Sequence, residues 1–147
     1  VKAGDRLKSG KLNLSVLNPG PDFEEEDGNG GSIVLQAEYG EFCGLFTGDI
    51  GEEQEELILE QVQPCSFLKV AHHGSKNSSC EDFLEKIHPV ISVISVGEKN
   101  LYNHPHPDAV RRLEKWSKEL HMTKEEGAVQ VWTDGQIMRV KGYLKDG

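Results

Sequence analysis

The sequence has no long apolar run, no closely paired cysteines and no excess of basic residues. None of its apolar stretches approaches the roughly 18 residues that a membrane-spanning helix needs, so we expect no direct membrane insertion by this segment. The chain has no signal-peptide core near Val1 and does not begin with Met, so we expect an excised or processed piece. With 16 Lys and Arg against 25 Asp and Glu, the net charge is −9. That balance excludes a broadly basic nucleic-acid-binding surface.

The acidic charge and the cysteines each leave a question open. A net charge of −9 fits a site that gathers cations, but it also fits simple solubility. Cys43, Cys65 and Cys80 are odd in number and widely spaced. This spacing predicts buried or free thiols rather than a disulfide framework, and it leaves the redox compartment undecided.

The length and the apolar pattern predict one α/β domain over residues 1–147. The acidic stretch 18–31, rich in Gly and Pro, is typical of a long loop. Ser78 or Ser79 is the expected cap of the second helix. The predicted strands are 11–17, 32–39, 42–47, 67–70, 90–96, 128–132 and 137–140, and the predicted helices are 51–61, 80–87 and 107–120.

Polar side chains follow three of the predicted strands where each strand ends. Asp49 follows one strand, His72 and His73 follow another, and His104 and His106 follow a third. If these strands are neighbours, the side chains converge on one rim of the sheet. Imidazole and carboxylate are common ligands of catalytic metals, and histidine is the usual acid or base near neutral pH.

Each of these residues also has a plain structural alternative. Asp49 could bridge two divalent ions, or it could cap the next helix in a capping box with Glu52. His72 and His73 point in different directions if the backbone is extended, so one could bind metal while the other contacts substrate. They could equally be surface histidines beside a turn, and Ser75 could be a turn or cap residue.

The segment His104-Pro105-His106-Pro107 holds two imidazoles between two prolines. A residue before proline is kept out of the helical region, so these side chains are preorganised as a site requires. The alternative is a proline-rich lead-in to the following helix. His88, at a turn, and His121, expected to close a helix, are assigned structural roles.

Taken together, these motifs resemble a known family. Thr47-Gly48-Asp49, His72-His73-Gly74-Ser75, Ser95-Val96-Gly97 and the segment 100–107, followed by Gly127-Ala-Val, are similar to metallo-β-lactamase-fold domains. The nearest likeness is to the C-terminal domain of ComEC-type competence proteins, which internalise DNA. The resemblance covers about residues 12–141 and implies an αββα sandwich with a dinuclear site, zinc or manganese, that hydrolyses phosphodiesters.

The resemblance also assigns roles to individual residues. It implies that Asp49 and His72 are metal ligands, with the choice between His72 and His73 left open. His73, His104 and His106 are the expected catalytic residues, touching metal or the scissile phosphate. Asn29-Gly30-Gly31-Ser32 matches the family's Asn-x-x-Ser segment, which leads into the strand before the aspartate. The expected substrate-binding residues are Ser75, Lys76 and Asn103.

One family motif is missing. The main metal motif, His-x-His-x-Asp-His, is absent, because His72 is the first histidine in the chain. We therefore expect the chain to be the C-terminal half of the sandwich, with the N-terminal half as a missing partner. Two ligands are too few for tight binding, so this fragment should bind metal weakly or not at all and hydrolyse nothing. Half a sandwich exposes apolar faces, which favours self-association or domain swapping.

The function expected of the complete domain is a metal-dependent nuclease acting on DNA during competence-linked uptake. Despite the acidic charge, Lys69, Lys76, Lys99, Arg111 and Arg112 could form a local basic patch near the rim. One alternative is hydrolysis of a small phosphodiester such as a choline phosphate ester, which calls for an aromatic cage, and Tyr102 is the one aromatic near the rim. Another is a non-catalytic binding or assembly module. The resemblance implies a bacterial membrane protein as parent, with this portion soluble.

Overall fold

A computed structural model describes residues 1–21, 23 and 25–144 of the chain. Within these residues the secondary structure alternates between strands and short helices. Its elements are β1 (Arg6–Ser9), β2 (Leu12–Asn18), the 3-10 segment Glu25–Gly31, β3 (Val34–Tyr39), β4 (Phe42–Phe46), α1 (Glu52–Ile58), β5 (Phe67–Lys69), the 3-10 segment Ala71–Gly74, α2 (Glu81–Ile87), β6 (Ile91–Ile94), α3 (Pro107–Trp116), β7 (Glu119–Met122), α4 (Thr123–Glu126), β8 (Val129–Thr133) and β9 (Met138–Gly142).

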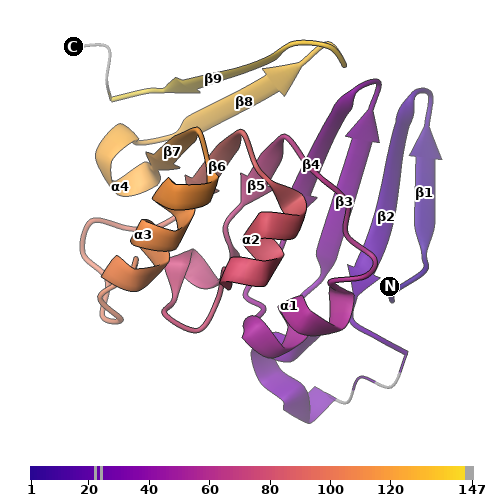
Figure 1. Cartoon of the computed structure of the whole chain (residues 1–147), viewed down its shortest axis with the longest axis horizontal. Coiled ribbons are helices and arrows are strands. Elements are labelled where there is room, and N and C mark those ends of the chain that lie inside the picture. The colour runs from indigo at the N-terminus through magenta and orange to yellow at the C-terminus, as the bar shows by residue number, and fades with distance from the viewer. Residues whose placement is uncertain (22, 24, 145–147) are drawn as a thin grey trace.

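The described strands form one large mixed sheet and a separate hairpin. Seven strands lie in the order β1-β2-β3-β4-β5-β6-β7, and β8 pairs with β9 in the second, two-stranded sheet. Strands β1 to β4 are antiparallel to their neighbours, whereas β4 to β7 are parallel. Helices α1, α2 and α3 lie along one face of the large sheet (Figure 1). The mixed α/β class is therefore confirmed, while the specific sandwich fold stays a prediction.

The main core lies between the sheet and these three helices. Alternate strand residues point to this face, because side chains alternate along a strand. From the strands it takes Val34, Leu45, Leu68 and Ile94, and the helices supply Ile58, Phe83, Leu84, Ile87 and Leu113, all of them buried. Fully burying a side chain of this kind stabilises the fold by about 1.5–3 kcal/mol, so this face anchors the loops at the sheet edge.

The opposite face of the sheet is only partly covered. A smaller core of Phe67, Ile91 and Val93 packs there against the β8–β9 hairpin. The pairing registers place further apolar residues on the same face at the β1 side, because directly paired residues share a face. Two of its side chains are markedly exposed, Leu7 at 63% and Phe46 at 41%. We call this surface of β1 to β4 the open face.

Most predicted elements are confirmed with shifted ends, but one predicted helix is wrong in its second half. The helix expected over 107–120 ends at Trp116, where Ser117 turns to extended backbone. Residues Glu119–Met122 instead form β7, which pairs in parallel with β6. Strand β1 and the short helix α4 had no sequence prediction. His121 thus lies on a strand rather than at a helix end, with Nδ1 2.9 Å from the Glu126 carboxylate.

The predicted helix caps are also wrong in detail. The cap residue of α1 is Gly51, whose N–H donates to the Gln54 side chain at 3.2 Å, so Asp49 lies outside the helix. The cap residue of α2 is Cys80, with no hydrogen bond from its own side chain. Instead, the buried Glu55 carboxylate caps α2 by accepting from the N–H groups of Ser79 and Cys80 at 2.6 and 2.9 Å. A carboxylate from a neighbouring helix therefore does what Ser78 or Ser79 was expected to do.

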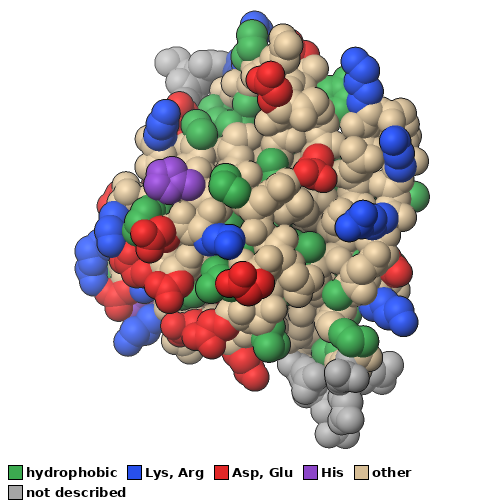
Figure 2. Space-filling model, turned by 45° about the vertical axis from the view of Figure 1, so that its right-hand side comes forward, with side chains coloured by type: hydrophobic (Ala, Val, Ile, Leu, Met, Phe, Trp, Pro, Cys, Tyr) green, Lys and Arg blue, Asp and Glu red, His purple; other side chains and the backbone are tan. Residues whose placement is uncertain are grey.

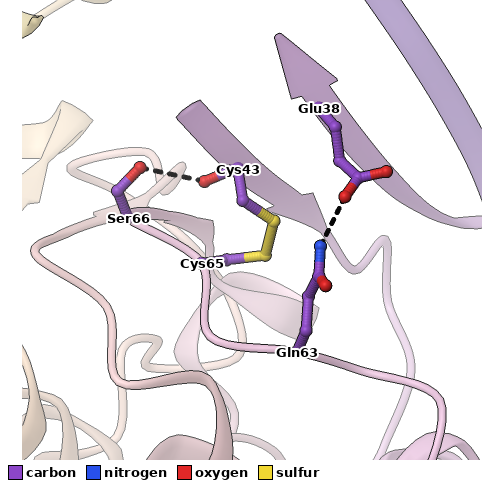
Figure 3. Close-up of a disulfide and its surroundings, with 5 residues drawn as sticks. All are labelled: Glu38, Cys43, Gln63, Cys65 and Ser66. Atoms are coloured by element: carbon purple, nitrogen blue, oxygen red, sulfur yellow. Dashed lines mark hydrogen bonds between the residues drawn. A yellow bond between two sulfur atoms is a disulfide. The ribbon is translucent and has the colours of Figure 1, made fainter. Parts of the chain in front are cut away.

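The expectation of three unpaired thiols is wrong. Cys43 on β4 and Cys65 just before β5 form a disulfide with a Cα–Cα distance of 4.5 Å (Figure 3). Beside it, the Ser66 hydroxyl donates to the Cys43 carbonyl, and Gln63 donates to Glu38. The two cysteines meet because β4 and β5 are parallel neighbours, a pairing that local spacing does not reveal. Cys80 remains a free thiol, and burial raises its pKa to about 12.

Reducing this disulfide should destabilise the fold by about 3 kcal/mol. The bond joins residues 22 positions apart, and closing a loop of that size restricts the unfolded chain by about this amount. The measurement is chemical unfolding with and without a reductant. In the control variant Cys43→Ser/Cys65→Ser the reductant should have no effect. Equal stability of the oxidised and reduced wild type would contradict the prediction.

Two surface properties complete the fold. In the part of the chain that the structure describes, no helix is long and apolar enough to cross a membrane.

The negative charge is unevenly distributed: carboxylates gather in one area of the face seen in Figure 2, with Lys and Arg around its margin. Helix α1 alone exposes Glu52, Glu53 and Glu56. The net charge of −9 therefore does not describe every part of the surface.

Candidate functional site

The predicted convergence at one edge of the sheet depends on the direction of three strands. Strands β4, β5 and β6 are parallel neighbours, so their C-terminal ends lie at the same edge. The loops that follow carry Asp49, the pair His72–His73, and the segment 95–106. Because β3 is antiparallel to β4, its N-terminal end also lies at this edge, together with the segment 29–32 that precedes it. We call this edge the histidine rim.

The backbone of the histidine pair is left-handed, not extended as the prediction assumed. His72 has φ 46° and ψ 42°, and His73 has φ 54° and ψ 25°. Such values are uncommon for residues other than glycine and are often found at functional sites, where surrounding contacts enforce them. Two consecutive residues of this kind, followed by Gly74 at φ 77°, make a tight reversal directly after β5. The two imidazoles still face different neighbours.

His73 faces Asp49. Its Nε2 lies 3.5 Å from the Asp49 Oδ1, and both side chains are about half exposed. Its Nδ1 lies 2.6 Å from the Ser95 carbonyl, an oxygen that can only accept, so Nδ1 carries the proton and donates. In the neutral ring this leaves a lone pair on Nε2, beside the carboxylate. A backbone carbonyl on the far nitrogen is the arrangement that orients metal-ligating histidines.

His72 faces the other side of the rim. The Asn29 amide lies 3.4 Å from its Nε2, and its ring meets that of His104 edge to face, with centroids 5.7 Å apart. The Ser32 hydroxyl accepts from the backbone N–H of Asp49 at 3.2 Å. Asn29 and Ser32 therefore join the Asp49 and His72 loops. This gives the Asn-x-x-Ser segment a definite place at the rim.

His104 lies between the other histidines and Tyr102. Burial lowers its pKa below the usual histidine value, and the neighbouring His72, His73 and His106 lower it further. Its ring stacks on Tyr102 with centroids 5.9 Å apart and an angle of 19°. The Asn100 side chain accepts from the His104 N–H at 2.8 Å and donates to its carbonyl at 2.8 Å. His104 is thus held from both its backbone and its ring.

His106 has the structural role offered as an alternative, and it also belongs to the rim. It caps α3, its Nδ1 accepting from the Asp108 N–H at 3.2 Å, with Pro107 in the first turn. Its own N–H donates to the Gly74 carbonyl at 2.8 Å. Since Nδ1 accepts, the neutral ring carries its proton on Nε2, which can donate to a ligand.

The three expected substrate-binding residues are spread over different positions. Asn103 is exposed beside His104, with φ 54°. Ser75 is buried, and its hydroxyl accepts from the Asn77 N–H at 3.3 Å, as a turn residue does. Lys76 lines a separate cleft of about 320 Å³ between the helices, together with Glu52 and Arg112. The rim therefore holds Asn103, while the Lys76 side chain borders another depression.

Most basic residues of the expected patch make other contacts. Arg111 pairs with Asp108 on the surface of α3. Lys69 is partly buried on β5 and donates to the Val70 carbonyl at 2.9 Å. Burial lowers the pKa of Lys69, and the nearby Asp49 charge opposes that shift. Lys99 is exposed on the loop before Asn100.

Two residues fix the loop after the histidine pair: Arg112, which was expected in the basic patch, and Glu55, which sequence reasoning missed. Arg112 on α3 donates to the carbonyls of Lys76, Ser78 and Ser79 at 2.8–2.9 Å. From the other side, the buried Glu55 accepts from the start of α2, and burial raises its pKa. The loop that carries His72 and His73 is thereby tied to the helices following Asp49 and His106. An Arg that lies 33 to 36 residues after the carbonyls it contacts gives no local signal in the sequence.

Replacing Arg112 with alanine should cost about 2–3 kcal/mol of stability. The change removes charge-assisted hydrogen bonds to three carbonyls, two of them partly buried and one exposed. Arg111→Ala is the matched control, since its exposed pair with Asp108 should contribute less than about 1 kcal/mol. Chemical unfolding of both variants makes the comparison. Equal losses would contradict the clamping role of Arg112.

The metal-binding capacity of the rim is limited in the described residues. Across 1–21, 23 and 25–144, no group of three or more His, Cys, Asp or Glu side chains is placed to hold a metal ion. Asp49 and His73 supply one carboxylate and one imidazole facing each other. A catalytic zinc site normally has three protein ligands. The donor chemistry fits a divalent ion, but the set is incomplete.

Similarity to known proteins supports the connection with competence. No protein-family model matches the sequence. The chain is 37% identical to ComE operon protein 3 of Bacillus subtilis over 134 residues, 88% of this chain and 17% of that protein. The chain is homologous to a segment of competence and recombination proteins. It is 30% identical to Recombination protein 2 of Haemophilus influenzae over 120 residues, 82% of this chain and 15% of that protein.

A third relative extends the same pattern. The chain is 34% identical to Competence protein ComA of Neisseria gonorrhoeae over 107 residues, 71% of this chain and 16% of that protein. The chain thus spans 15–17% of the length of these relatives. The expected kinship with competence proteins is confirmed. The metallo-β-lactamase-type fold, the metal site and the catalytic activity stay predictions.

Proposed function

We propose that this chain is the C-terminal half of a metallo-β-lactamase-type domain whose complete form is a metal-dependent nuclease acting on DNA. The observation that carries the proposal is the Asp49–His73 pair. The two side chains lie 3.5 Å apart after neighbouring parallel strands, with the far nitrogen of His73 held by the Ser95 carbonyl. Competence proteins as relatives favour DNA as the substrate over other phosphodiesters.

In the complete domain, Asp49 and His73 would hold divalent ions, zinc or manganese. The geometry favours His73 over His72 as the partner of Asp49, because His72 faces Asn29 and His104 instead. The remaining ligands would come from outside the described residues. When bound, the ions supply an activated water and neutralise charge on the phosphate.

The open face is the proposed contact with the other half of the domain. Its exposed apolar residues, Leu7 at 63% and Phe46 at 41%, lie on the side of the sheet that no helix of the described chain covers. A second layer there would bury this surface and complete the ligand set at the adjoining rim. The chain's small share of its relatives' length is consistent with such a partner segment.

The chain's own residues would bind and orient the phosphodiester. His106 offers its Nε2–H to a phosphate oxygen, since its Nδ1 accepts from the Asp108 N–H. Such a positioned histidine can stabilise charge in the transition state or give a proton to the leaving oxygen. The contacts of Asn100 with the His104 backbone keep that imidazole in place beside His72. With the metal ions bound, these donors would serve hydrolysis in the complete domain.

The test uses the full-length protein and a labelled single-stranded oligonucleotide. Cleavage should require Mn²⁺ or Zn²⁺ and stop with a chelator. His73→Ala and His72→Ala should each lower the rate by about 10–100-fold. The control is His88→Ala, whose exposed imidazole lies at the end of α2 against Trp116, away from the rim. Unchanged cleavage in both rim variants, or no metal-dependent cleavage by the wild type, would overturn the proposal.

A further inference from the structure

A cleft of about 370 Å³ opens beside the histidine rim. Its walls are formed by two rim histidines, a backbone segment after β6 and one exposed aromatic ring. The lining residues are His73, Ser95, Val96, Gly97, Asn100, Tyr102 and His104. The volume lies in the range of about 300–1,000 Å³ found for small-molecule sites. None of these lining residues is acidic, although the chain carries a net charge of −9.

The ring of Tyr102 is unusually exposed for an aromatic side chain. Tyr102 is 77% exposed and the preceding Leu101 is 96% exposed. One side of the Tyr102 ring stacks on His104 with an angle of 19°. Exposing two large apolar side chains together costs free energy unless they contact a ligand or partner.

The loop that carries Tyr102 is fixed at its base. The Asn100 amide donates to the carbonyls of Gly97 and His104, at 3.2 and 2.8 Å. The Thr123 hydroxyl accepts from the Val96 N–H at 2.7 Å on the other side of the loop. With its base anchored and its ring on His104, Tyr102 loses little further freedom when a second flat group stacks on it.

We propose that Tyr102 is a stacking platform for a nucleobase of single-stranded DNA adjoining the scissile phosphodiester. The proposal deepens the nuclease function and rests on it. A base stacked on Tyr102 places its own backbone phosphate at the neighbouring His73 and His104, which line the same cleft. Stacking on an aromatic ring tolerates any base, because every base has a π face.

The lining favours a neutral planar base over a quaternary ammonium group. Cation recognition uses a cage of several aromatic rings. Here Tyr102 is the one ring of Phe, Tyr or Trp among the lining residues, and no carboxylate supplements it. A single platform with polar groups at one side suits a base and its attached phosphate. The choline ester alternative therefore gains no support from this cleft.

The first test measures binding without divalent ions, so that nothing is cleaved. The probe is a fluorescein-labelled oligothymidine of about 12 nucleotides, and the assay uses the same full-length protein as the cleavage test. Tyr102→Ala should raise Kd by about 5- to 150-fold, while Tyr102→Phe keeps the ring and stays within about twofold. Tyr143→Ala, an exposed tyrosine on the C-terminal side of β9, is the matched control. Unchanged affinity of Tyr102→Ala, or equal losses for Ala and Phe, overturns the proposal.

The second test separates base recognition from chemistry. With Mn²⁺, Tyr102→Ala should raise KM for the oligonucleotide by a larger factor than it lowers kcat, whereas Tyr102→Phe should keep both values within about twofold. A Tyr102→Ala protein that loses kcat with KM unchanged would place Tyr102 in the chemical step and overturn the stacking role. Failure of the wild type to cleave the oligonucleotide would sink the nuclease function instead, and the binding measurement would still decide whether Tyr102 stacks a base.

Discussion

Replacing Asp49 with alanine should lower metal-dependent DNA cleavage by the full-length protein more than about 100-fold. Losing an outer-shell partner of a metal site typically costs about 10–100-fold, and losing a carboxylate ligand costs more. Asp49 is the carboxylate that faces His73 at 3.5 Å, and it follows β4 at the edge where three parallel strands end. Its N–H bond to Ser32 comes from the backbone, so alanine keeps the loop in place.

The control for this prediction is Asp82→Ala, because Asp82 is an exposed aspartate on α2 that lines the separate cleft away from the rim. Both variants should unfold at nearly the wild-type temperature. Titration with Mn²⁺ should show weaker binding for Asp49→Ala alone. An Asp49→Ala protein that cleaves DNA and binds Mn²⁺ like the wild type would remove Asp49 from the metal site, whatever the fold.

The sequence predicts the frame of this site well, because its signals are local. Apolar runs at 42–47, 67–70 and 90–96 predict strands, and polar residues after each run predict the rim. The structure confirms β4, β5 and β6 as parallel neighbours, so Asp49 and the histidines do share an edge. The convergence follows from strand direction, which alternating strands and helices already favour.

The features that could not be predicted all depend on contacts between distant segments. The sequence of Glu119–Met122 continues the helical pattern of α3, but this segment forms strand β7 because it pairs with the edge of β6. The disulfide forms because Cys43 and Cys65 flank paired strands. The different roles of His72 and His73 depend on their left-handed backbone, which brings the His73 side chain to Asp49. An extended backbone would not have predicted which of the two histidines faces Asp49.

The second large effect is expected from Gly74→Ala. Gly74 has φ +77°, and an added Cβ would lie 2.7 Å from the Pro105 Cβ and 3.3 Å from its Cα. The left-handed backbone costs an alanine about 1–2 kcal/mol. Relieving the overlap costs about 1–3 kcal/mol more, because it must move the backbone of the segment that holds His104 and His106. We expect a loss of about 4 kcal/mol in stability, measured by chemical unfolding.

The same substitution should also open the histidine rim. His106 donates its N–H to the Gly74 carbonyl at 2.8 Å, so pushing Pro105 away separates His72 and His73 from His104 and His106. Cleavage should then fall even in the fraction that remains folded, with kcat lowered rather than KM alone. Gly20→Ala is the matched control, since a Cβ there meets nothing within 4 Å. If Gly74→Ala and Gly20→Ala were equally stable and active, the close contact of Gly74 with Pro105 would have no part in bringing the histidines together.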